Sequence, residues 1–181
     1  MVRFILITLS LFLVSCSSIP LGTMLQLSTF NENSFLSLNP EELKTKILVD
    51  MPAKIAVSKT KISLTLKTEK GDLAFNYPLT LISTKNLPKE NGFFSSIPQR
   101  TEYLLVLSNE AIEDFRKVQN EMRTKSPKSV SFNVNFDFEE FPTKLAEVTF
   151  SIFLKLSKED DFITLFDRGS LKVNYSGQKN E

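Results

Sequence analysis

The residue types that most often carry enzyme chemistry are scarce in this chain. Its 181 residues contain no His, a single Cys and only five Gly. Without His, the chain cannot form a Ser-His-Asp triad, a Cys-His pair or a zinc site built on imidazole. One thiol excludes an intrachain disulfide and a thiolate metal cluster. The glycines are too dispersed to form a phosphate-binding loop.

Three short polar clusters could still do chemistry. The acidic residues at 139–140 and 159–161 could bind Ca²⁺ or supply paired carboxylates, but they lack the EF-hand spacing and are typical of solvated turns. Residues 176–179 match the Ser-x-x-Lys string of penicillin-recognising enzymes, but no buried helix can hold them so close to the last residue. We therefore expect a non-enzymatic protein with no catalytic residue, metal or cofactor. A hydrolase that works without His is the last alternative.

The single Cys follows a segment that is typical of an export signal. Arg3 gives a positive start, an apolar run extends from position 4 to position 14, and Ser15 and Cys16 follow at once. A transmembrane helix needs about 20 apolar residues, whereas the core of a signal peptide needs about 7–15. The pattern therefore predicts a signal peptide over residues 1–15.

The sequence Leu13-Val14-Ser15-Cys16 resembles the lipobox of bacterial lipoproteins. The resemblance implies that the Cys16 thiol receives a diacylglyceryl group, that cleavage falls between Ser15 and Cys16, and that a fatty acid such as palmitate acylates the new amine. The acyl chains would anchor the protein, at about 0.8 kcal/mol per buried methylene. Ser17 resembles the outer-membrane pattern, which implies the periplasmic face of the outer membrane. The inner membrane is the alternative.

Charge and composition describe an ordinary globular chain after the signal peptide. The 22 basic and 21 acidic residues nearly cancel, which gives no electrostatic basis for binding nucleic acid. Hydrophobic residues make up 41% and charged residues 24%, which argues against disorder. We expect an anchor and partly docked tether over 16–38, one β-rich domain over 39–175 and a tail over 176–181.

Strand patterns dominate the predicted domain. Apolar residues alternate with polar ones over 62–66, 73–81, 130–138 and 148–156, and residues 46–51 and 103–107 are further strand candidates. A tight turn is expected at Gly71, and an edge or a bulge at Pro78. The alternation places one set of side chains inside (Phe132, Val134, Phe136, Phe150, Ile152 and Leu154) and another in water (Asn133, Asn135 and Ser151). On this basis, Phe136→Ala should cost about 3–5 kcal/mol and Asn135→Ala little.

One helix is well marked. Ser108 or Asn109 can cap it, Pro127 can stop it, and an apolar stripe runs along it (Ile112, Phe115, Val118 and Met122). Residues 39–42 predict a helix of a turn or two, and residues 157–169 fit either a helix or a strand. The predicted fold is mainly β: an antiparallel sheet or sandwich with one amphipathic helix packed on it.

The remaining candidate site is a pair of aromatic residues. Phe93 and Phe94 lie in a predicted loop over 86–99, where they could dock a partner or pin the loop to its own core. The sequence therefore predicts a membrane-anchored envelope lipoprotein that binds or scaffolds another envelope protein. The alternative is a carrier of a lipid or other apolar ligand. An open apolar pocket would favour the carrier, whereas a filled core with an exposed aromatic patch would favour the scaffold.

Overall fold

The computed structural model describes residues 30–92, 96–124, 128–140 and 147–172, and in this part of the chain the protein is mainly β. A seven-stranded sheet has the order β7-β2-β3-β6-β1-β8-β9, and every neighbouring pair in it is antiparallel. Its strands are β1 (Lys44–Asp50), β2 (Lys54–Thr68), β3 (Gly71–Leu87), β6 (Arg100–Leu107), β7 (Ser129–Glu140), β8 (Glu147–Lys155) and β9 (Ile163–Lys172). A two-stranded hairpin adds β4 (Glu90–Asn91) and β5 (Ser96–Ile97). The predicted fold class is confirmed.

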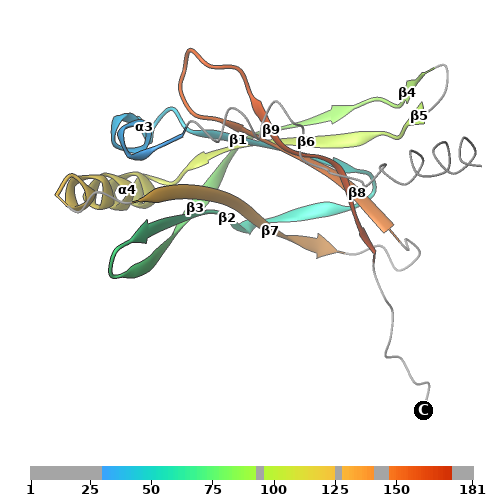
Figure 1. The fold of residues 1–181 in the computed structure, drawn as a ribbon. Helices are drawn as coiled ribbons and strands as arrows, with labels where there is room; N and C mark the ends of the chain where they lie inside the picture. Colours follow the sequence, from blue (N-terminus) through green and yellow to red (C-terminus); the bar gives the residue numbers. More distant parts are fainter. Residues whose placement is uncertain (1–29, 93–95, 125–127, 141–146, 173–181) are drawn as a thin grey trace, which may run out of the picture.

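The long strand β3 folds the sheet into two facing layers (Figure 1). Residues 71–78 of β3 pair with β2, whereas residues 79–87 pair with β6. Pro78 lies where β3 exchanges one neighbour for the other, and its carbonyl accepts the N–H of Ser108 at 3.1 Å. Because proline has no N–H to donate, this junction is a position that it can occupy without a missing ladder bond. The small layer contains β7, β2 and the first half of β3. The large layer contains the second half of β3 with β6, β1, β8 and β9.

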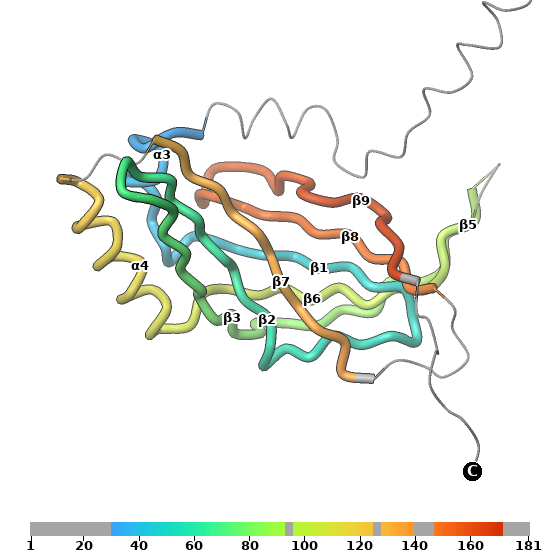
Figure 2. Tube along the Cα trace, turned by 60° about the horizontal axis from the view of Figure 1, so that its bottom comes forward, coloured from blue at the N-terminus to red at the C-terminus, as the bar shows by residue number. Residues whose placement is uncertain are grey.

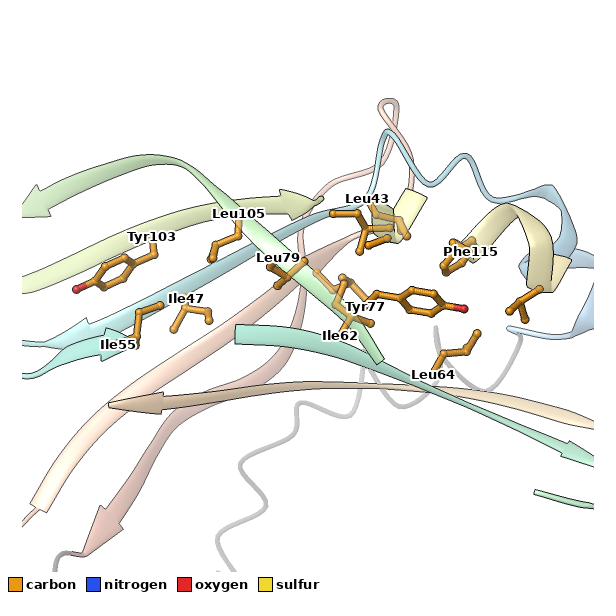
Figure 3. Close-up of a cluster of buried hydrophobic side chains, with 14 of the residues drawn as sticks. Leu43, Ile47, Ile55, Ile62, Leu64, Tyr77, Leu79, Tyr103, Leu105 and Phe115 are labelled. Atoms are coloured by element: carbon orange, nitrogen blue, oxygen red, sulfur yellow. The ribbon is translucent and has the colours of Figure 1, made fainter. Parts of the chain in front are cut away.

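The hydrophobic core fills the space between the two layers (Figure 3). Side chains from β1, β2, β3 and β6 meet there, and they are almost fully buried: Ile47, Ile55, Ile62, Leu64, Tyr77, Leu79, Tyr103 and Leu105. The alternation predicted over 62–66 is confirmed. The series over 73–81 is only partly right, because Leu73 and Leu81 at its two ends are each 37% exposed. Leu73 follows the hairpin turn, and Leu81 lies at an irregularity in the β3–β6 register.

Two helices cover one end of the core. Helix α4 (Asn109–Met122) begins at Ser108, whose hydroxyl accepts the N–H of Ala111, and it buries Phe115, Val118 and Met122 as predicted. Helix α3 (Glu32–Ser37), which the sequence analysis did not predict, is capped by Asn31. The side chain of Gln119 in α4 donates to the carbonyl oxygens of Phe35 and Leu38 at 2.8 and 2.9 Å. These two bonds hold α3 against α4.

Some local predictions need correction. Residues 39–42 form a single turn, the lower end of the one or two turns expected, because β1 begins almost at once and Asn39 bonds within the turn. The predicted loop over 86–99 begins later than expected, since β3 continues to Leu87 and the β4–β5 hairpin follows. The ambiguous segment over 157–169 ends in β9, so its second part is a strand.

Ser151 was predicted to face water, but it is only 5% exposed. Its hydroxyl donates to the carboxylate of Asp167 at 3.1 Å and accepts the N–H of Arg168 at 3.0 Å. Both partners belong to an irregular stretch of β9, where Arg168 has a positive φ of 45°. The bulge in β9 therefore covers the face of β8 that an even alternation would leave open.

Candidate functional site

Most residues predicted to act at a site lie outside the described part of the chain. This applies to Ser15 and Cys16 at the cleavage position and to the aromatic pair Phe93 and Phe94. The acidic residues at 159–161 are described, and their side chains are exposed in a bend before β9. Within the ranges that the structure describes, no three acidic or other metal-ligating side chains gather closely enough to hold a metal ion. No helix within those ranges is long and apolar enough to cross a membrane.

A groove with a volume of about 1260 Å³ is lined by β7 of the small layer and by β8 and β9 of the large layer. Figure 2 shows β7 crossing the strands of the large layer at an angle. We call this hollow the β7–β9 groove. Its apolar lining comes from all three strands: Phe132, Val134, Phe136, Phe138, Phe150, Ile152, Leu165, Phe166 and Leu171. Pro78 and polar residues of β2 and β7 complete the lining: Ser58, Lys59, Thr60, Lys61, Asn133, Asn135 and Asp137.

An aromatic chain crosses the groove from one layer to the other. The ring of Phe136 lies 5.2 Å from that of Phe150 at an edge-on angle of 87°, and Phe138 lies 6.5 Å from Phe150. Phe150 in turn stacks on Phe166, with 5.2 Å between centroids and 21° between planes. Phe136, Phe138 and Phe150 pack against the core, and all four rings are only partly buried. They therefore present a continuous apolar surface to whatever enters the groove.

Strand β9 has an exposed apolar residue beside the groove. Phe136 and Phe138 of β7 lie beside Phe150 of β8, and Phe150 stacks on Phe166 of β9. Leu171 of β9 lines the groove and is 45% exposed, which is high for a leucine on the inner face of a two-layer fold. The inner face of β9 thus forms one wall of the groove.

Gly169 allows the Phe166 ring to lie flat against the backbone of β9. A Cβ atom at Gly169 would overlap Cε1 of Phe166, so the ring covers the glycine directly. Any other residue at position 169 would push the ring away from its stacked position on Phe150. The glycine therefore fixes one aromatic wall of the groove.

We expect Gly169→Ala to destabilise the protein by about 1–3 kcal/mol, because the new methyl group displaces the Phe166 ring from its packed position. Urea unfolding measures the loss. In a Phe166→Ala background the ring is absent, so the same glycine substitution should cost much less. Equal costs in the two backgrounds would contradict the proposed contact.

Positive charges outnumber negative ones among the residues that line the groove, which include Lys59, Lys61 and Asp137. Lys59 pairs with Asp137 at 3.6 Å, and both side chains are about two-thirds exposed at 66% and 64%. An exposed pair at this distance contributes little to stability. The buried hydroxyl of Thr60 donates to the carbonyl of Ala56 at 3.1 Å and closes the bend in β2. Polar side chains of β2 and β7 therefore share the groove lining with the aromatic rings.

A buried tyrosine hydroxyl lies elsewhere, at the helical end of the core. Tyr77 is 2% exposed, and its hydroxyl has no hydrogen-bond partner among the described residues. Burial, with a smaller contribution from the Asp114 charge, raises the pKa of this hydroxyl well above its ordinary value. Its ring packs on Phe115 with 5.1 Å between centroids, and Tyr77 does not line the β7–β9 groove. We therefore assign it to the core.

Comparison with known proteins gives no family assignment: no family model, no curated protein and no solved structure matches the chain. The groove is therefore the feature from which a function must be argued. Sequence patterns indicated the inner face of β7 but gave no sign that β9 lies uncovered opposite it. The sequence did not indicate Leu165 and Phe166 as site residues, because the pattern over 157–169 fitted either a helix or a strand.

Proposed function

We propose that the protein is a lipoprotein of the bacterial envelope, anchored through Cys16, whose domain binds an apolar ligand of the acyl-chain class in the β7–β9 groove. The single observation that carries the ligand is the lining, in which five phenylalanines and four aliphatic side chains form the apolar part of a hollow of about 1260 Å³ that polar residues of β2 and β7 complete. Ligand pockets in proteins usually measure about 300–1,000 Å³ and are mostly apolar. A groove of this size can receive a long hydrocarbon chain.

The geometry favours binding over the other functions considered. Hydrolysis needs paired acid and base groups held in a cleft, whereas the charged residues that line the groove are Lys59, Lys61 and Asp137, and Lys59 and Asp137 form an exposed ion pair. A scaffold would be better supported by a filled core and a flat aromatic patch, but here the aromatic residues line a hollow. Each methylene that leaves water on entering such a site contributes about 0.8 kcal/mol.

Filling the groove should abolish ligand binding. In Leu165→Trp the larger ring occupies space that an acyl chain would use, while Leu165 itself is only half-buried, so the fold should tolerate the change. The protein is reconstituted in vesicles of phosphatidylethanolamine and phosphatidylglycerol with a photoactivatable fatty acid. After illumination, mass spectrometry measures labelling of peptides from 129–172. We expect labelling of the wild type and about a tenfold decrease in the variant.

The matched control is Leu81→Trp, which makes the same change at a 37% exposed leucine outside the groove. It should leave labelling of 129–172 unchanged. Melting temperatures of both variants separate loss of binding from loss of the fold. Equal labelling of the wild type and Leu165→Trp, or no labelling of the wild type, would rule out the groove as an acyl-chain site.

A further inference from the structure

The outer side of the large layer carries both apolar and basic residues. In β1, β6 and β8 the side chains that point into the core are buried, and the alternate ones point outward and remain partly exposed: Lys44, Lys46, Leu104, Val106, Phe153 and Lys155. We call these residues the outer patch. Figure 1 shows α3 and α4 at one end of the layers, so neither described helix lies over the middle of this surface.

The outer patch is continuous across the three strands. Its residues form two neighbouring rows in the register of β6, β1 and β8. The first row contains Leu104, Lys46 and Phe153, and the second contains Val106, Lys44 and Lys155. Side chains that stand opposite each other on neighbouring strands have Cβ atoms about 4.5–5.5 Å apart. The lysines and the apolar side chains are therefore in contact range of one another.

The three lysines of the outer patch lack acidic partners. Lys44 and Lys155 stand directly opposite each other, and like charges in this position destabilise a sheet. The ammonium group of Lys46 lies 4.9 Å from the centre of the Phe153 ring and 4.4 Å from that of Phe162. Among the described residues, no Asp or Glu side chain forms an ion pair with any of these lysines. The patch therefore holds positive charge that the domain does not neutralise.

Neighbouring surfaces differ in this respect. On the outer side of the small layer, the hydroxyl of Ser63 donates to the amide oxygen of Asn76 at 2.6 Å and accepts an N–H of Asn135 at 2.7 Å. On the large layer, Glu102 stands one row beyond the patch and opposite Lys85. In both places the polar groups have partners within the fold. The outer patch instead has the composition of a surface that meets an anionic partner.

We propose that the outer patch rests on an anionic lipid bilayer, with its ammonium groups at the lipid phosphates and its apolar side chains at the boundary with the acyl chains. Charge complementarity points to this partner, because each lysine near an anionic membrane strengthens binding about fivefold. Lysine stems can lie on apolar surface while their charged ends reach the headgroups. A nucleic acid would match the lysines but would offer nothing to Leu104, Val106 and Phe153. The inference goes beyond the groove and does not depend on its ligand.

The first test measures which side of the domain touches the membrane. The full-length protein is reconstituted in vesicles of phosphatidylcholine and phosphatidylglycerol, with a nitrobenzoxadiazole dye on Ser83→Cys, a position opposite Leu104 on the outer side. Ala74→Cys is the matched exposed position on the outer side of the small layer. A spin-labelled lipid quenches a dye that contacts the bilayer. We expect about fivefold stronger quenching at position 83 than at position 74.

This difference should disappear in vesicles of phosphatidylcholine alone and at high salt, because both conditions remove the electrostatic attraction. Equal quenching at the two positions, or none at either, would overturn the proposal. Quenching at position 83 that is the same with and without phosphatidylglycerol would also overturn it, since the partner would then not be an anionic surface.

The second test reverses the charge of the patch. Lys44→Glu with Lys155→Glu keeps two like charges opposite each other, so stability should change little. Lys54→Glu with Lys67→Glu makes the same change of charge at exposed positions of β2 in the small layer. The first pair should lower quenching at position 83 to the level of position 74, and the second should leave it unchanged. Melting temperatures check that both pairs fold. Undiminished quenching in the first pair, or the same loss in both pairs, would contradict membrane contact through the patch.

A single substitution separates membrane contact from a purely structural role. Lys155→Glu places opposite charges across the β1–β8 pair, so it should raise the melting temperature by about 1–3 °C. The same substitution removes positive charge from the patch, so it should weaken quenching at position 83. A more stable protein with undiminished quenching would show that the lysines do not hold the domain at the membrane, and the proposal would fail.

Discussion

Phe115→Ala should lower the free energy of unfolding by about 3–5 kcal/mol, the largest loss we expect from any single core substitution. The side chain is 0% exposed, and its ring centroid lies 5.4 Å from that of Phe35 and 5.1 Å from that of Tyr77. It therefore joins both helices to the sheet. Removal of the ring leaves a cavity that these three elements cannot close together, and a typical domain has only about 5–15 kcal/mol to lose. Urea unfolding of both proteins measures the difference.

The informative comparison is Phe136→Ala. The sequence alone assigned the 3–5 kcal/mol loss to this residue, but the Phe136 ring is only partly buried and lines the groove. Water can enter the space that its removal creates, so the cavity contribution is small and the loss should be less than half that of Phe115→Ala. Equal losses for the two variants would show that the groove is closed in solution and would contradict its description as an open site.

Alternation of side chains made the strands predictable. The polar and apolar positions of 62–66 and 130–138 repeat at period two, and that period depends only on the local geometry of a strand. Helix α4 was equally clear, because the cap at Ser108 and the apolar stripe through Phe115 are both local signals. Features that depend on neighbours within a few residues could therefore be placed without knowledge of the fold.

Features that depend on residues far away in the sequence could not be predicted in this way. No local signal shows that β3 exchanges β2 for β6 near Pro78, and this exchange is what turns one sheet into two facing layers. Ser151 occupies a polar position by alternation, but the bulge of β9 at Asp167 and Arg168 buries it. The groove has the same origin, because its lining joins β7, at one end of the strand order, to β8 and β9, at the other end.

Helix α3 shows a third kind of difficulty. Its six residues contain Phe35, which is fully buried, but the segment is too short to display a helical period. Its position is fixed by Gln119, a polar residue in the middle of α4 whose amide reaches two carbonyl groups of the α3 region. The burial of Gln119 can be explained only when the positions of both helices are known, because its hydrogen-bond partners lie in and next to α3. The described part of the predicted tether is thus held by contacts with the domain.

The anchor gives the prediction with an all-or-none outcome. Cys16→Ala should abolish both lipidation and cleavage before residue 16, because Cys16 is the only cysteine in the chain and no other thiol can accept the diacylglyceryl group. Metabolic labelling with an alkyne fatty acid, followed by gel electrophoresis, checks the modification, and the uncleaved variant should migrate at a higher mass. Ser17→Ala is the matched control and should retain the label, because it leaves the lipobox intact. Acyl chains hold a domain at a bilayer through about 0.8 kcal/mol per buried methylene. A salt wash removes proteins that are bound only by electrostatic attraction, because salt screens charges. The mature wild type should therefore still sediment with membranes after such a wash. Fatty-acid label on the Cys16→Ala protein would contradict the proposed anchor.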